Sequence, residues 1–166
     1  EAAAARRQLG KGVDHPARQV VDPQRQRPAQ DHLPHLVGDG QGLVGAAVAE
    51  KEPNDGFRAA QALKLPTVVE GAINRPKDVD VYRIEGKKGQ KLFVEVLASR
   101  HGSPLDATLT LFDAKGQQLA ANDDFLKDHR DAKIEATLPA DGFYYLSLID
   151  AHDSGSNLHV YRLVIR

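Results

Sequence analysis

The stretch Lys91-Leu92-Phe93-Val94-Glu95-Val96 decides the fold class, because apolar and polar side chains alternate along it. In an extended chain, Leu92, Val94 and Val96 fall on one side, which is typical of a β-strand with one buried face. We therefore predict a strand over residues 91–96 whose leucine and valine face joins a hydrophobic core.

Seven further segments of the sequence are strand candidates with a similar pattern: 67–73, 80–85, 108–111, 117–121, 132–138, 144–148 and 161–165. Turn sequences separate several of them, including Lys-Lys-Gly at 87–89, Asp-Ala-Lys-Gly at 113–116 and Asp-Gly at 141–142. About eight short strands with turns every 8–12 residues predict an all-β fold, an antiparallel jelly-roll-like β-sandwich. One short helix is expected over residues 56–63, with Asn54 or Asp55 as its N-cap.

The composition of the 166 residues fits one ordinary domain and excludes several classes of protein. Lys and Arg total 22 and Asp and Glu total 23, for a net charge of −1, which argues against a nucleic-acid or anionic-membrane partner. No apolar run is long enough for a transmembrane helix. The absence of cysteine excludes disulfides and thiolate metal sites. Lacking methionine and a recognisable signal peptide, the sequence is interpreted as a fragment or a processed piece.

The aromatic residues divide the chain into two parts. All nine, five Phe and four Tyr, lie between Phe57 and Tyr161. Residues 1–48 have no aromatic side chain and too little apolar surface for a core, so we predict a linker-like or poorly ordered segment there. A misread reading frame would also produce such a stretch. Residues 49–166 are predicted to form the β-sandwich domain.

Catalytic motifs are weak in this sequence, and we expect no enzyme. Gly40, Gly42 and Gly45 match a dinucleotide-binding spacing, but no strand–helix unit surrounds them. His32 and His35 lack a third metal ligand nearby. The serines and histidines fall into no nucleophile motif, although a catalytic triad is a spatial arrangement that sequence alone does not exclude.

Two acidic clusters are more informative. Residues 50–55, Glu-Lys-Glu-Pro-Asn-Asp, carry four side chains with oxygen ligands. Asp78 and Asp80 precede Tyr82 on the same predicted strand face, about 6.5–7 Å apart. Calcium prefers six to eight oxygen ligands, and the two clusters together could supply most of them. The alternative is that these acids cap the helix and lie in solvent. A third cluster, Asn122-Asp123-Asp124 with Asp128 and Asp131, is either a second site or a solvated loop.

The order of these motifs resembles the bacterial pre-peptidase C-terminal (PPC) domain family. The resemblance begins with Glu-Lys-Glu-Pro-Asn-Asp at 50–55 and Asp-Val-Asp-Val-Tyr at 78–82, and covers residues 50–166. It continues through the segments 71–73, 89–92, 105–113, 116–124, 142–146 and 161–163. The family is similar to the collagen-binding domains of clostridial collagenases.

This resemblance implies a non-catalytic, secreted or periplasmic β-sandwich attached to the catalytic domain of an exported bacterial enzyme of the peptidase type. It also implies stabilisation by calcium where the N-terminal linker meets the sandwich. Carried over by motif, the candidate ligands are Glu50, Glu52, Asn54, Asp55, Asp78 and Asp80. The alternative function is an independent carbohydrate- or matrix-binding domain whose partner is extracellular matrix or polysaccharide. A row of exposed aromatic side chains on one sheet face would favour that alternative.

Overall fold

The computed structural model describes residues 47–125 and 130–166. The predicted linker-like segment 1–48 therefore lies, apart from its last two residues, outside the described residues. The description that follows concerns the compact unit that includes residues 47–166.

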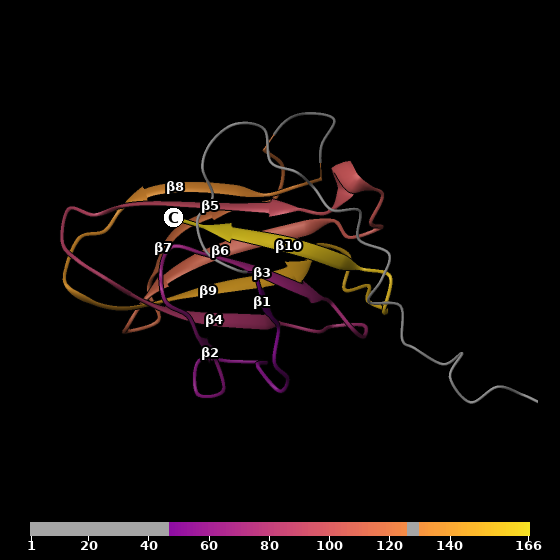
Figure 1. Cartoon of the computed structure of the whole chain (residues 1–166), viewed down its shortest axis with the longest axis horizontal. Coiled ribbons are helices and arrows are strands. Elements are labelled where there is room, and N and C mark those ends of the chain that lie inside the picture. The colour runs from indigo at the N-terminus through magenta and orange to yellow at the C-terminus, as the bar shows by residue number, and fades with distance from the viewer. Residues whose placement is uncertain (1–46, 126–129) are drawn as a thin grey trace, which may run out of the picture. The chain divides into compact units, whose positions relative to one another are not determined.

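The described part of the chain forms two five-stranded sheets, which Figure 1 labels strand by strand. Sheet A has the order β1-β3-β10-β5-β8 and sheet B the order β2-β4-β9-β6-β7. The strands are β1 (Val48–Ala49), β2 (Gln61–Ala62), β3 (Thr67–Ala72), β4 (Asp80–Gly86), β5 (Lys91–Leu97), β6 (Ala107–Asp113), β7 (Gln118–Asn122), β8 (Lys133–Thr137), β9 (Gly142–Asp150) and β10 (Val160–Ile165). A single 3₁₀ turn, Ser99–His101, interrupts this all-β arrangement within the described residues.

The eight segments predicted as strands are β3 to β10, so the predicted all-β class is confirmed. The pairings among these eight strands are antiparallel, as expected. The two remaining strands were not predicted, and both pair in parallel, β1 with β3 and β2 with β4. The sheets are therefore mixed, and the jelly-roll type of connection stays a prediction.

The predicted helix over residues 56–63 is wrong, because this segment forms a turn followed by β2. The backbone N–H of Leu63 donates to the carbonyl of Arg83, and Gln61 lies opposite Tyr82. An isolated helix of two turns is only marginally stable in water. Pairing with the edge of β4 instead gives the backbone N–H and C=O groups of this segment stable hydrogen-bond partners.

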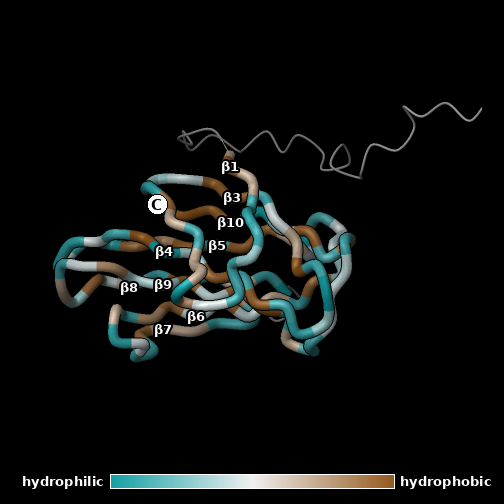
Figure 2. The backbone as a smooth tube through the Cα atoms, turned by 90° about the horizontal axis from the view of Figure 1, so that it is seen from below, coloured by the Kyte–Doolittle hydropathy of each residue, from teal (hydrophilic) through white to brown (hydrophobic). Residues whose placement is uncertain are grey.

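The hydrophobic core lies between the sheets and confirms the predicted strand phase. Leucine and valine side chains on the apolar faces of the predicted strands are each at most 1% exposed: Leu92, Val94, Leu109, Leu111, Leu146, Leu148 and Leu163. Tyr82 and Tyr161 are fully buried in the same cluster. Hydrophobic segments, brown in Figure 2, concentrate in the strands, whereas the connecting loops are mostly hydrophilic.

Residues 48–62, which we call the strap, connect the edges of the two sheets. The strap begins with β1, the outermost strand of sheet A, and ends with β2, the outermost strand of sheet B. Figure 1 shows this indigo-to-purple segment running from one sheet to the other. The acidic residues at 50–55 are therefore held across an open side of the sandwich.

Leu111→Ala and Leu146→Ala are each expected to lower the free energy of unfolding by about 2–5 kcal/mol, because each removes buried apolar surface and leaves a cavity. Denaturant unfolding measures the change. Leu158→Ala is the control, since this side chain is 63% exposed, and its effect should stay within about 0.5 kcal/mol. Equal losses at the buried and exposed positions would contradict the assigned core.

Candidate metal centre

Glu50 reaches the sandwich because the strap extends sheet A beyond β1. Its backbone N–H donates to the carbonyl of Glu70 at 2.9 Å, and its carboxylate Oε2 accepts the backbone N–H of Ala72 at 2.9 Å. Gly71 makes this approach possible. A Cβ at Gly71 would lie 2.7 Å from Glu50 Oε2 and 2.6 Å from the Tyr161 hydroxyl, closer than side chains pack.

Asp80 is the fully buried acid of the cluster. It begins β4, where the alternation of the strand directs it to the same side as Tyr82 and Ile84. The Tyr161 hydroxyl donates to Asp80 Oδ2 at 2.5 Å, and the Tyr82 and Tyr161 hydroxyls are hydrogen-bonded at 2.5 Å. A short polar network therefore begins inside the core and ends at the carboxylate.

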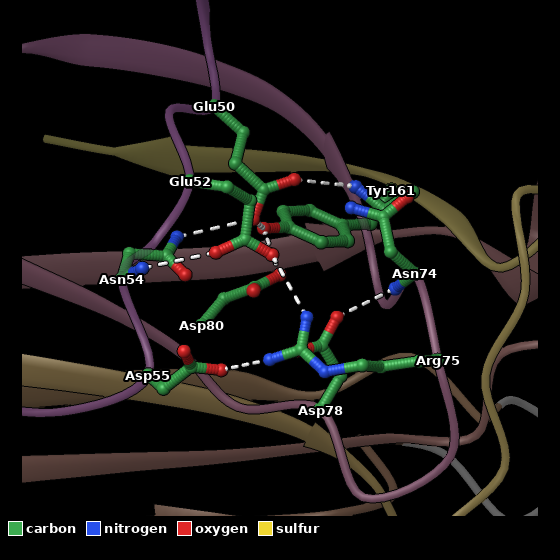
Figure 3. Close-up of polar contacts among 10 residues, drawn as sticks. Glu50, Glu52, Asn54, Asp55, Asn74, Arg75, Asp78, Asp80 and Tyr161 are labelled. Atoms are coloured by element: carbon green, nitrogen blue, oxygen red, sulfur yellow. Dashed lines mark hydrogen bonds and ion pairs between the residues drawn. The ribbon is translucent and has the colours of Figure 1, made fainter.

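Three carboxylates converge where the strap crosses β4. Glu50, Glu52 and Asp80 each offer an oxygen, and these oxygens lie within 4.8 Å of one another. Figure 3 shows Glu50 and Glu52 reaching down from the strap above Asp80. The sequence placed these acids up to thirty positions apart, and the tertiary structure brings them into one group.

Asn54 completes the group from the strap and is itself fully buried. Its side-chain Nδ2 donates to Glu50 Oε1 at 3.1 Å, and its backbone N–H donates to Glu52 Oε2 at 2.9 Å. Its carbonyl accepts the N–H of Val81 at 3.0 Å, which ties the strap to β4. Asn54 Oδ1 and Asp80 Oδ1 are buried and accept no hydrogen bond from the described residues.

Burial and like charge raise the pKa of Asp80 to about 9, with desolvation the largest cause and the neighbouring Glu50 the next. Burial also raises the pKa values of the Tyr82 and Tyr161 hydroxyls, so both tyrosines stay protonated and able to donate. Without a cation, the cluster thus favours a proton on Asp80. A bound cation would compensate the same charge.

The ligand chemistry of this group fits calcium. The available atoms are carboxylate and amide oxygens, which hard divalent cations prefer. The two unpartnered buried oxygens, Asn54 Oδ1 and Asp80 Oδ1, are the decisive observation, because buried acceptors are normally paired. Glu50, Glu52, Asn54 and Asp80 are therefore the residues that could hold the ion.

Asp55 and Asp78, the other two predicted ligands, contact Arg75. The Arg75 guanidinium donates to Asp55 Oδ1 and lies 3.0 Å from Asp78 Oδ1. It also lies 3.6 Å from Glu52 Oε1. Sequence reasoning did not identify Arg75, although its position three residues before Asp78 was an available signal.

The third acidic cluster is partly structural. Asp131 is fully buried, and its Oδ1 accepts the backbone N–H groups of Ala98 and Ser99 at 3.0 and 2.7 Å. Its Oδ2 accepts Arg100 Nε at 2.5 Å. Asn122 Oδ1 accepts the Lys133 N–H at 2.8 Å. Asp131 and Asn122 thus hold loops and strands together, and Asp128 lies outside the described residues.

One serine–histidine contact occurs among the described residues, between Ser156 Oγ and His159 Nδ1 at 2.9 Å. The same hydroxyl accepts the backbone N–H of Leu158 at 3.2 Å, and His159 N–H donates to the Ser156 carbonyl at 3.0 Å. These bonds close a local turn before β10. They account for the contact as loop structure.

No helix in the described part of the chain is long and apolar enough to span a membrane.

Comparison with known proteins finds similarity to domains and sequences of peptidases. Residues 78–149 match the sequence model of the bacterial pre-peptidase C-terminal domain, which confirms the resemblance found in the motifs. A probable subtilase-type serine protease of Deinococcus radiodurans is 38% identical over 100 residues, which cover 58% of this chain and 14% of that protease. The matched region is thus a small part of that protease.

The fold of the pre-peptidase C-terminal domain of a Bacillus anthracis collagenase is also similar. That crystal structure superimposes with a TM-score of 0.51 at 17% identity, over 64% of this chain and 94% of the collagenase domain. At this identity the similarity concerns the fold alone.

Asp80→Asn is expected to stabilise the chelator-treated protein more at about pH 8 than at about pH 5. Below its ordinary pKa of 3.8, Asp80 is protonated in both the folded and the unfolded chain. As the pH rises from about 4 towards 9, the unfolded chain releases this proton and the folded chain retains it, so stability from this group is lost. Asparagine has no such proton to release.

Thermal unfolding of both proteins across this pH range in chelator measures the difference. Asp153→Asn, at an exposed aspartate, is the matched control. A stability difference between Asp80→Asn and the unmodified chain that does not vary with pH would contradict the raised pKa.

Proposed function

We propose that this chain, which carries a bacterial pre-peptidase C-terminal domain in residues 78–149, is a non-catalytic accessory module of an exported peptidase. The observation that carries the proposal is the match to the Deinococcus protease, most of whose length lies outside the matched residues. The partner would be the catalytic domain of the parent enzyme, and the location extracellular or periplasmic. The described residues supply a fully packed sandwich, and their one serine–histidine contact is a loop turn.

The module is further proposed to be stabilised by calcium at Glu50, Glu52, Asn54 and Asp80. Bound calcium would offset the charge of the three carboxylates, Glu50, Glu52 and Asp80, and connect the strap to β4. The convergence of three carboxylate oxygens within 4.8 Å and the two unpartnered buried oxygens support this site. In a chain without cysteine, such a link would do what a disulfide does elsewhere, since a ligand specific to the folded state stabilises it.

A second candidate function, carbohydrate or matrix binding, has one observation in its favour. Aromatic side chains gather on the outer face of sheet B, where Phe57 stacks on Tyr145 with ring centroids 4.5 Å apart and meets Phe112 edge-on at 5.3 Å. Phe143, 47% exposed, lies on the same strand face, with Arg83 4.9 Å above its ring. Phe57 and Phe143 thus remain 39% and 47% exposed on this face. We nevertheless favour the accessory role, because the sequence matches part of a protease.

One set of experiments distinguishes the two functions. Under the accessory proposal, deletion of this module from the parent gene lowers the amount of active secreted peptidase, while the isolated chain neither cleaves protein substrates nor sediments with insoluble polysaccharide or collagen. Under the alternative, the isolated chain sediments with one of these polymers, and the double variant Phe57→Ser, Phe143→Ser no longer does so. Proteolysis by the isolated chain would contradict both.

Calcium is expected to raise the melting temperature and to protect residues 50–60 from proteolysis. About 5 mM calcium suffices if the site resembles other extracellular sites, which bind at roughly 10⁻⁴–10⁻³ M. Asp80→Asn should abolish the response, whereas Asp124→Asn, at an exposed position, should retain it. Magnesium should act weakly, because it demands octahedral geometry and dehydrates reluctantly. Identical melting curves in chelator and in calcium would eliminate the site.

A further inference from the structure

Arg75 lies between three carboxylates at the outer side of the metal centre. Figure 3 shows its guanidinium directed towards Asp55, Asp78 and Glu52. It is hydrogen-bonded to Asp55, lies 3.0 Å from Asp78 Oδ1 and lies 3.6 Å from Glu52 Oε1. Two of these acids belong to the strap, and the third precedes β4, so one side chain connects both.

Hydrogen bonds and close packing fix the backbone of the turn at Arg75, whose side chain is 54% exposed. Its carbonyl accepts the N–H of Asp78 at 3.1 Å, which closes the turn. The N–H of Lys77 donates to the carbonyl of Asp153 at 3.1 Å, and Gly155 packs so tightly that a Cβ there would lie 2.0 Å from the Arg75 carbonyl oxygen. The turn is therefore fixed on the loop that precedes β10.

Asp78 needs this cation because its carboxylate is buried. The residue is 1% exposed, and its Oδ2 accepts the N–H of Asn74 at 2.7 Å. Its Oδ1 accepts no hydrogen bond from the described residues and has the Arg75 ion pair instead. An unpaired charge in this position would be strongly destabilising.

We propose that Arg75 is a built-in cation that neutralises the outer carboxylates, Asp55 and Asp78, and thereby limits the metal centre to one calcium ion. The ion count rests on the calcium site proposed above, whereas the neutralisation of Asp78 does not. Arginine suits this position because its planar fork contacts several carboxylates at once and stays charged. The nearby carboxylates, Asp78 foremost, raise its pKa further.

The geometry also separates the outer carboxylates from the inner ones. Calcium binds its oxygens at about 2.3–2.6 Å. A guanidinium nitrogen 3.0 Å from Asp78 Oδ1 already occupies that side of the oxygen. A second divalent ion between Asp55 and Asp78 would have to displace Arg75. The strap is consequently held at two points, of which only the inner one depends on calcium.

The test compares Arg75→Gln and Arg75→Lys with the unmodified chain. Isothermal titration with calcium gives the number of ions per chain, and thermal unfolding in chelator gives the contribution of the outer contacts. Arg58→Gln, which removes an exposed arginine of the same strap, is the matched control and should change neither quantity.

The expected result is one ion for the unmodified chain and for Arg75→Lys, and two for Arg75→Gln. In chelator, the melting temperature of Arg75→Gln should be lower than that of the unmodified chain. The melting temperature of Arg75→Lys should lie between these two values. Two ions in the unmodified chain, a single ion in Arg75→Gln, or an Arg75→Gln variant that unfolds in chelator like the unmodified chain would each overturn the proposal.

A distinct outcome separates this inference from the calcium proposal. If the unmodified chain binds no calcium, the calcium site fails, and unfolding in chelator alone decides the role of Arg75. A lower melting temperature of Arg75→Gln then supports neutralisation of Asp78, and an unchanged one overturns it.

Discussion

The burial of the Asp80 carboxylate at the boundary between the core and the strap is the constraint on which the surrounding structure depends. A charge removed from water needs a hydrogen-bond donor, a proton or a cation, and among the described residues Asp80 has a single donor, the Tyr161 hydroxyl. Its second oxygen remains unpartnered and its pKa is strongly raised. Because Glu50 and Glu52 approach the same point, the strap can dock only where this negative charge is compensated.

The strap also solves a problem common to open β-sandwiches, the exposed edge strands. β1 covers the edge of β3 and β2 covers the edge of β4. Each adds parallel backbone pairing where an unpaired edge would otherwise attract another chain. The residues between β1 and β2 carry the acidic side chains. Docking of the strap therefore brings these carboxylates together, and its stability depends on how their charge is compensated. This coupling ties the strap to the sandwich although β1 and β2 are only two residues long.

The acidic cluster is divided between two kinds of compensation. Arg75 pairs with Asp55 and Asp78 and lies 3.6 Å from Glu52, whereas Glu50 and Asp80 have no ion pair with a basic side chain among the described residues. If the proposed calcium site is occupied, the strap gains rigidity at Glu50, Glu52 and Asp80. The Arg75 contacts would hold part of the strap in place before calcium is encountered.

The sequence by itself determined the class of fold and the identity of the core. Alternation with a period of two is a local property, so strands such as β5 and inward residues such as Leu111 and Leu146 could be assigned from it. The resemblance to the pre-peptidase C-terminal family was likewise found from the order of its motifs, and residues 78–149 match the model of that family. Only the tertiary structure decided which partner each acid of the cluster contacts.

Asp78 and Asp80 are equivalent in a strand pattern. In the structure, however, Asp78 pairs with Arg75, whereas Asp80 lies beside Glu50 and Glu52 of the strap. The same explanation applies to two further features: the parallel pairings of β1 with β3 and of β2 with β4, and the absence of the expected helix at 56–63. Short segments with weak local preferences adopt the structure that a distant strand edge or a distant charge offers them, and no local pattern contains that information.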